Sequence, residues 1–200
     1  MSTTMMKLVS LSFLIVACSV SQTHALFGFG DAENCVAPCV PGEESIMAQK
    51  EHGSSHTPVQ QDLRWDCDWN TSDRICNYNR HYAERAGYWE TTEFLPSVDT
   101  AANEPVAFYD SNSGRKLFTS PVDRTWQDFL AESRNHGWPS FRDSEVNWDY
   151  VRVLPNGETV SIDGTHLGHN LPDRKGNRYC INLVSIAGNP AERFHRRNKK

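Results

Sequence analysis

The turn at Pro155-Asn156-Gly157 is the strongest indication of fold in this chain. Asn-Gly between two strand-like runs is typical of a tight β-hairpin, because both residues tolerate the left-handed backbone that such turns require. The flanking runs are rich in β-branched and aromatic side chains: Trp148, Tyr150, Val151, Val153 and Leu154 before the turn, and Thr159, Val160 and Ile162 after it. We therefore expect an antiparallel pair of strands here.

Two further stretches extend the antiparallel pattern. A second hairpin is predicted from the apolar runs 106–109 and 116–118, which flank a polar turn that ends at Gly114. The apolar run 179–186 is short enough for a central strand, and it carries Cys180 near its beginning. The sequence thus predicts a mostly β domain over 93–190.

Two short helices are also predicted. One covers 72–86, with Ser72 as its cap and Gly87 as its stop. The other begins at Ser120-Pro121, because proline is common in the first position of a helix. The apolar side chains of this second helix recur at helical spacing and should form its buried stripe: Trp126, Phe129 and Leu130.

Residues 1–25 have the composition of a secretory leader. Lys7 precedes an apolar run that is too short to span a bilayer, and Thr23-His24-Ala25 offers small residues to a signal peptidase. We expect a protein of the secretory pathway, secreted or in an organelle lumen, without a stable membrane span. The alternative is a bacterial lipoprotein anchored through Cys18.

The charge pattern does not predict a basic surface that would bind nucleic acid. The formal net charge is -5, and basic residues gather only in the tail 191–200, which we expect to be disordered. Nucleic acid is therefore not an expected partner.

Cleavage after Ala25 would leave five cysteines, which export to an oxidising compartment would allow to pair. Four of them lie in a partly irregular extension over 26–92, and Cys180 stands alone near the end. Four cysteines allow three pairings, of which we favour the short loops: Cys35 with Cys39, and Cys67 with Cys76. Cys180 then remains as an unpaired thiol.

Three segments combine residues of chemical interest: 136–141 (His-Gly-Trp-Pro-Ser-Phe), 164–169 (Gly-Thr-His-Leu-Gly-His) and 178–182 (Arg-Tyr-Cys-Ile-Asn). Singly each is weak, since a His-x-x-His pair arises easily by chance and one cysteine is more often core than catalyst. In this order the segments resemble the B-type methionine sulfoxide reductases, over about 109–186. The resemblance implies two antiparallel sheets packed as a small open barrel or tent.

The resemblance also implies an activity, the reduction of methionine R-sulfoxide in oxidised proteins or as the free amino acid. Cys180 matches the attacking cysteine, and Trp138 matches the indole that receives the methyl group of the substrate. His166, His169 and Asn182 match the polar lining of the sulfoxide site, and Arg178 matches the neighbouring cation.

The chemistry needs these residue types. Only a thiolate is a competent nucleophile, so Cys180 needs a positive or hydrogen-bonding neighbour. The sulfoxide oxygen must be protonated, for which His169 is the first choice, with His166 orienting it or sharing the role. Phe141 would add to the apolar wall for the methyl group. Cys180 would end the step as a sulfenic acid.

The chain departs from the family at two places. Asp110, Ser113, Val160 and Asp163 occupy the positions of four zinc-binding cysteines in many members, so we expect the zinc-lacking type and no bound metal or cofactor. His136 stands where the usual resolving cysteine does, and we group it with the substrate-binding residues. Either a cysteine of the extension (Cys35, Cys39, Cys67 or Cys76) or an external reductant, a small thiol or thioredoxin-like protein, must then resolve the sulfenic acid.

Two other classes of function fit the same residues. A secreted metal-binding protein would use His136, Asp163, His166 and His169 around an ion. A non-catalytic, disulfide-stapled binding module would keep the scaffold without activity, which the departure at His136 favours and the retention of Cys180 opposes.

Overall fold

The computed structural model describes residues 35–191, so the predicted leader, the lipoprotein cysteine Cys18 and all but the first residue of the basic tail lie outside the described residues. The architecture is mostly β, as expected, with two antiparallel sheets and two α-helices in the described part of the chain. Neither sheet closes into a barrel there. No helix between residues 35 and 191 has the length and apolar character needed to cross a membrane.

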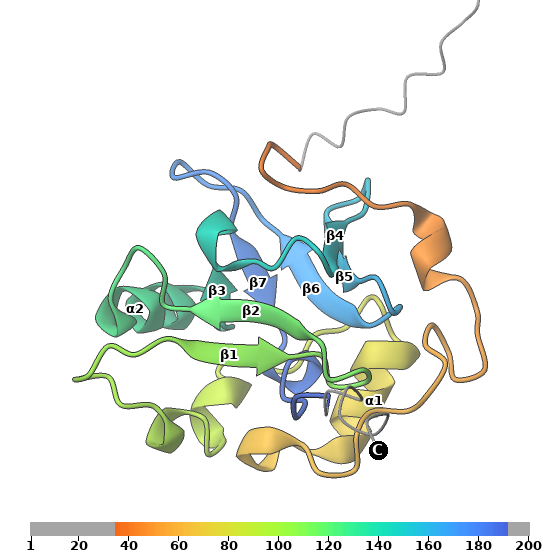
Figure 1. The fold of residues 1–200 in the computed structure, drawn as a ribbon, viewed down its shortest axis with the longest axis horizontal. Helices are drawn as coiled ribbons and strands as arrows, with labels where there is room; N and C mark the ends of the chain where they lie inside the picture. Colours follow the sequence, from red (N-terminus) through yellow and green to blue (C-terminus); the bar gives the residue numbers. More distant parts are fainter. Residues whose placement is uncertain (1–34, 192–200) are drawn as a thin grey trace, which may run out of the picture.

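The smaller sheet is a hairpin, and the larger one has five strands (Figure 1). β1 (Val106–Tyr109) pairs with β2 (Lys116–Ser120), which confirms the hairpin expected there. The larger sheet runs in the order β3-β7-β6-β5-β4, and all its pairs are antiparallel. Its strands are β3 (Ser140–Phe141), β4 (Val151–Val153), β5 (Glu158–Ser161), β6 (His166–Asn170) and β7 (Tyr179–Ile181). The Asn-Gly turn joins β4 to β5, as predicted.

An aromatic core joins the two sheets. Phe108 of β1 and Phe118 of β2 contact Phe141 of β3, with ring centroids 5.1 and 4.4 Å apart. Phe129 of α2 (Trp126–His136) packs on the same ring, while Trp89 and Phe94 from the first half of the chain are fully buried in the same cluster. Burial of large rings is the main stabilising contribution in such a core. The first half is thus packed onto the β domain.

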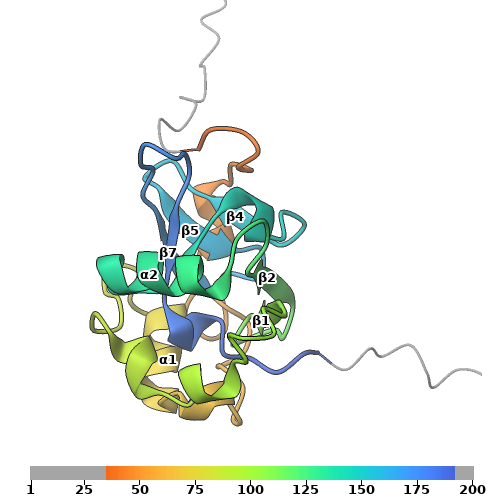
Figure 2. The same cartoon turned by 90° about the vertical axis from the view of Figure 1, so that its left-hand side faces the viewer.

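α2 (Trp126–His136) begins later than predicted. Thr125 is its cap, and Thr125 and Asp128 form a reciprocal capping box. Ser120 does not start the helix, because it is the last residue of β2 and pairs with Val106, while its hydroxyl and the Val122 N–H both donate to the Glu145 carboxylate. The predicted buried stripe of this helix is confirmed. Figure 2 shows a short turn at Leu183–Ser185 (blue) between α2 and α1 (Trp69–Asn77).

α1 (Trp69–Asn77) begins and ends earlier than predicted. Asp68 is its cap, since its carboxylate accepts the Thr71 N–H at 2.8 Å. Ser72, the predicted cap, is buried inside the helix and donates its hydroxyl to the Val184 carbonyl. Beyond Asn77 the tyrosines expected on the helix are exposed, so no apolar face holds the chain helical to residue 86.

The run 179–186 is a strand only at its beginning. β7 ends at Ile181, and a short 3₁₀ turn follows at Leu183–Ser185. The reason is Glu84, whose carboxylate accepts the N–H groups of Leu183 and Val184 at 2.9 and 3.0 Å. These two N–H groups are therefore not available for hydrogen bonds to a neighbouring strand, and β7 cannot continue through them.

One of the two expected disulfides is present. Cys35 and Cys39 are bonded, with Cα atoms 5.3 Å apart. The predicted pairing of Cys67 with Cys76 is wrong, because both thiols are free and buried. α1 directs Cys76 toward Ser185, whose hydroxyl lies 3.5 Å from its sulfur, rather than toward the residue that precedes the helix.

Candidate active site

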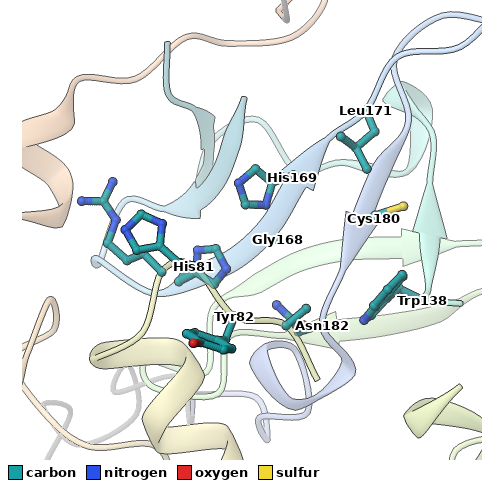
Figure 3. A pocket seen from close by; sticks show the side chains of 11 residues that line it. His81, Tyr82, Trp138, Gly168, His169, Leu171, Cys180 and Asn182 are labelled. Atoms are coloured by element: carbon teal, nitrogen blue, oxygen red, sulfur yellow. The ribbon is translucent and has the colours of Figure 1, made fainter. Parts of the chain in front are cut away.

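A cavity of about 270 Å³ opens where β6 and β7 meet the segment 80–83. It brings together five of the residues singled out in the sequence: Trp138, His166, His169, Cys180 and Asn182. Figure 3 shows His169 and Cys180 on adjacent strands, with the Trp138 indole, the Asn182 amide and the Tyr82 ring below them. The rim carries two large apolar side chains that are well exposed, Tyr82 at 64% and Leu171 at 47%.

Strand alternation positions Cys180. Tyr179 and Ile181 point into the core and are fully buried, so Cys180 between them points to the opposite face and is half-buried. In the sheet register Cys180 lies opposite His169 of β6 and Ser140 of β3. Paired residues of antiparallel strands share a face and lie about 5 Å apart. Cys180 therefore lies between His169 on one neighbouring strand and Ser140 on the other.

The Cys180 sulfur has two polar contacts. Nη1 of Arg178 donates to Sγ at 2.5 Å, and the Ser140 hydroxyl lies 3.7 Å away. Arg178 is itself nearly buried, and its Nε lies 3.5 Å from the carboxylate of Asp173, which also accepts from Arg142. A guanidinium held in this way offers a charge-assisted hydrogen bond to a thiolate.

A β-bulge brings the two histidines to the same face. His166 and His169 are three residues apart, which in a regular strand would point them in opposite directions. The register of β5 against β6 shifts between Thr159 and Val160, so β6 accommodates one extra residue there. Gly168 permits this, since it has a φ of 157° and a Cβ atom would meet the Cys180 carbonyl oxygen at 2.1 Å. The two rings lie 5.8 Å apart between centroids.

The electrostatic surroundings of His169 disfavour its protonation. Burial lowers the pKa of His169 below its ordinary value, and the positive charges that His166 and His81 can carry lower it further. The carboxylate of Glu158 acts in the opposite direction. His169 is therefore present mainly as neutral imidazole near pH 7 and becomes a stronger acid when it is protonated.

Trp138 and Asn182 are fixed by the main chain of Glu84. The indole N–H of Trp138 donates to the Glu84 carbonyl at 2.9 Å, and the Asn182 side-chain oxygen accepts the Glu84 N–H at 3.0 Å. Gly137, in the left-handed conformation, ends α2 immediately before the indole. Burial raises the pKa of the Glu84 carboxyl to about 7, although its two backbone hydrogen bonds oppose the change.

Other predicted residues lie outside the cavity. Phe141 is fully buried in the aromatic core, so it does not form part of the cavity wall. His136, at the end of α2, lines a separate, highly charged cavity of about 850 Å³ instead. Asp163 forms an ion pair with Arg115. Within residues 35–191, no three or more His, Cys, Asp or Glu side chains gather in a way that could hold a metal ion.

The candidate resolving cysteines are also placed elsewhere. Cys35 and Cys39 are bonded to each other, and none of the four cysteines of the first half lines the cavity. Burial raises the pKa of Cys67 to about 12, and it raises the pKa of Cys76 as well. Thiols of this kind are poor nucleophiles at neutral pH.

Five residues that contribute to the site escaped the sequence interpretation: Arg80, Glu84, Ser140, Glu158 and Asp173. Ser140 and Asp173 are close in sequence to predicted residues, and strand alternation next to Cys180 could have identified Ser140. Glu158 carries a weaker signal, an acid at the start of a predicted strand. Arg80 and Glu84 lie in an irregular segment without any local motif.

Comparison with known proteins leaves the chain without an assigned family, since no protein-family model and no curated protein matches it.

Proposed function

We propose that this protein is a thiol-dependent reductase of methionine R-sulfoxide, with Cys180 as the nucleophile. The observation that carries the proposal is the free, half-buried Cys180 thiol, which lies opposite His169 and is contacted by Arg178 at the wall of a cavity that also contains the Trp138 indole. The choice of the R epimer rests on the sequence resemblance alone.

The first step transfers oxygen from substrate to protein. The Cys180 thiolate attacks the sulfur of the sulfoxide, and the sulfoxide oxygen takes up a proton. The resulting hydroxyl group is then transferred to the cysteine sulfur. The net change is Cys180–SH plus sulfoxide to Cys180–SOH plus thioether, so the thiol supplies the two electrons. The thioether methyl group would lie against Trp138, where sulfur–aromatic contacts are favourable.

The residues around the thiol have distinct tasks in this step. Arg178 supports the thiolate by a charge-assisted hydrogen bond. His169, directly across the strand pair, delivers the proton to oxygen; its lowered pKa makes the protonated ring the stronger acid but also the minor form near pH 7. One N–H of the Asn182 amide donates to the Leu167 carbonyl and its oxygen accepts the Glu84 N–H, so we assign Asn182 to holding the 80–84 segment, while its second N–H can donate to the same oxygen.

The second step regenerates the thiol. The cysteines of the first half are bonded to each other or buried away from the cavity, so we propose an external thiol as the reductant. One thiol condenses with Cys180–SOH to a mixed disulfide and water, and a second thiol displaces it as a disulfide. A small thiol or a thioredoxin-like protein in the compartment to which the predicted leader would direct the chain would serve.

The test is turnover of the two separated epimers of a methionine sulfoxide peptide, with dithiothreitol as reductant. We expect turnover of the R epimer and none of the S epimer, and we expect Cys180→Ser to lose at least a thousandfold in rate because a hydroxyl cannot replace the thiolate. Cys67→Ser is the matched control and should keep its rate. Equal rates for parent and Cys180→Ser would end the reductase proposal.

A further inference from the structure

The His166 ring has a buried carboxylate partner. Nδ1 of His166 lies 2.7 Å from Oε1 of Glu158, and each side chain is only 2% exposed. An ionised carboxylate can only accept hydrogen bonds, so Nδ1 must carry the proton in this pair. His166 also lines the cavity. Nε2 is therefore the ring nitrogen that is available to a molecule bound there.

The Glu158 carboxylate is in turn held by Arg80. Nε of Arg80 donates to both carboxylate oxygens at 3.1 and 3.0 Å, and Nη2 donates to Oε2 at 2.5 Å. Burial by itself would raise the pKa of Glu158, but the hydrogen bonds from His166 and Arg80 hold it below its ordinary value. Such a forked guanidinium–carboxylate pair fixes both charge and orientation.

Arg80 reaches this pair from a distant part of the sequence, 78 residues before Glu158. It lies in the irregular segment that follows α1, and its other partner is the exposed Glu44, 2.5 Å from Nη1. Two segments of the first half thus meet over the start of β5. This series of contacts reaches the cavity, which both Arg80 and His166 line, and the ring of His166 lies edge-on to the ring of His169, with 5.8 Å between the centroids.

We propose that Glu158 and Arg80 are positioning residues for His166, an inference that rests on the proposed reductase function. Arg80 holds the Glu158 carboxylate in place, and Glu158 fixes His166 in the tautomer that carries its proton on Nδ1. His166 then exchanges protons with the bound sulfoxide, or with His169, only through Nε2. When Nε2 takes up a proton, Glu158 stabilises the resulting imidazolium, as carboxylates do for histidines in acid–base catalysis.

The direct test is the tautomer of His166, measured by ¹⁵N NMR of the imidazole nitrogens in parent and Glu158→Gln protein. We expect the Nδ1–H form in the parent. In Glu158→Gln the amide can donate to Nδ1, so we expect the Nε2–H form to appear. This measurement needs no substrate, and it therefore tests the positioning role even if the protein proves not to reduce sulfoxides.

The kinetic test uses the same variant. We expect Glu158→Gln to lower kcat for the R-sulfoxide peptide by about tenfold to a hundredfold, the usual effect of losing a partner that orients a functional histidine, with little change in KM. Glu158→Asp should recover part of the rate, because it keeps an ionised acceptor. Arg80→Lys should lose less than Glu158→Gln, because an ammonium keeps the charge but not the fork.

Glu44→Gln is the matched control. Glu44 binds Arg80 but contacts neither Glu158 nor His166, so the variant should keep the Nδ1–H tautomer and stay within twofold of the parent rate. A Glu158→Gln protein with unchanged tautomer overturns the proposal, whether or not its rate has fallen, because a fall without a tautomer change indicates a merely structural role. If Glu158→Gln does not fold, kcat in Glu158→Asp and Arg80→Lys decides, because both variants keep a carboxylate acceptor for Nδ1, and parent-like kcat in both overturns the proposal.

Discussion

The five-stranded sheet and the irregular segment that follows α1 contribute to the same cavity in different ways. This segment spans residues 78–87 and includes the cavity-lining residues 80–83. The sheet supplies the groups that would react, Cys180 and the two histidines, and strand register fixes where they point. The segment supplies groups that hold those residues in place: the Arg80 side chain on Glu158 and the Glu84 main chain on Trp138 and Asn182. The sheet thus carries the candidate reactive side chains, and the irregular segment fixes the orientation of their neighbours.

The same contrast holds for the free thiols. Cys67 and Cys76 belong to the first half of the chain and are buried against it, whereas Cys180 lies at the surface of a strand beside a guanidinium. All three are the same chemical group. Because only the surroundings of the three thiols differ, their reactivities can be compared with one reagent on one protein.

The largest expected effect is the difference in alkylation rate among these thiols. At pH 8, iodoacetamide followed by peptide mapping should label Cys180 at least a thousandfold faster than Cys67 or Cys76. The pKa of Cys67, raised by burial to about 12, leaves only about one thiolate in ten thousand at that pH, and Cys76 is fully buried. Comparable labelling of Cys67 under native conditions would show that the first half opens readily and is no fixed support for the cavity.

A second prediction concerns stability and pH, through Glu84. Its pKa is raised by burial from an ordinary 4.5 to about 7 in the folded protein. Between these values the folded state holds a proton that the unfolded state has lost, so the free energy of unfolding should fall as pH rises, by up to about 3 kcal/mol, and level off above pH 7. The fall is absent below pH 4.5, where both states are protonated.

Urea unfolding of parent and Glu84→Gln protein at pH 5 and pH 8 measures this contribution. The variant should be less stable than the parent at pH 5, because its amide replaces one acceptor for the Leu183 and Val184 N–H groups. It should lack the parent's loss of stability between the two pH values. An identical loss in both proteins would assign the pH dependence to another group, such as the buried Asp110, whose pKa burial also raises.

The strands and the residues on them were largely predictable. Both hairpins follow from turn residues between β-branched runs, and Cys180, His166, His169, Trp138 and Asn182 converge because three strands or their ends carry them. Phe141 shows the limit of this reasoning. β3 is only two residues long, and its alternation places Ser140 beside the thiol and Phe141 in the core. Sequence proximity to Trp138 did not reveal which face each residue takes.

The supporting contacts could not be predicted, because they join residues that lie far apart in sequence through side chains or main-chain atoms of an irregular segment. Arg80 meets Glu158 across 78 residues, and Glu84 meets Asn182 across 98. No periodicity or turn signal encodes such pairs. Distant carboxylates also explain two wrong element bounds: Glu145 binds Ser120, where a helix start was predicted, and Glu84 binds the Leu183 N–H, where a continued strand was predicted.

The smallest expected effect tests the link between the two regions at Trp138. In the proposed reductase, Trp138→Phe would keep an apolar wall for the methyl group of the substrate, but it removes the indole N–H that donates to the Glu84 carbonyl at 2.9 Å. Loss of one neutral hydrogen bond corresponds to about 1 kcal/mol, or about fivefold. Because the ring would still contact the thioether but would be less firmly placed, we expect this loss mainly in KM for the R-sulfoxide peptide. Trp138→Ala, which removes the wall itself, should do far more damage. If Trp138→Phe matches the parent in both kcat and KM, the hydrogen bond from the indole to the Glu84 carbonyl does not affect substrate binding. The contrast between sheet and segment would then depend on the contacts of Arg80 and Asn182 alone.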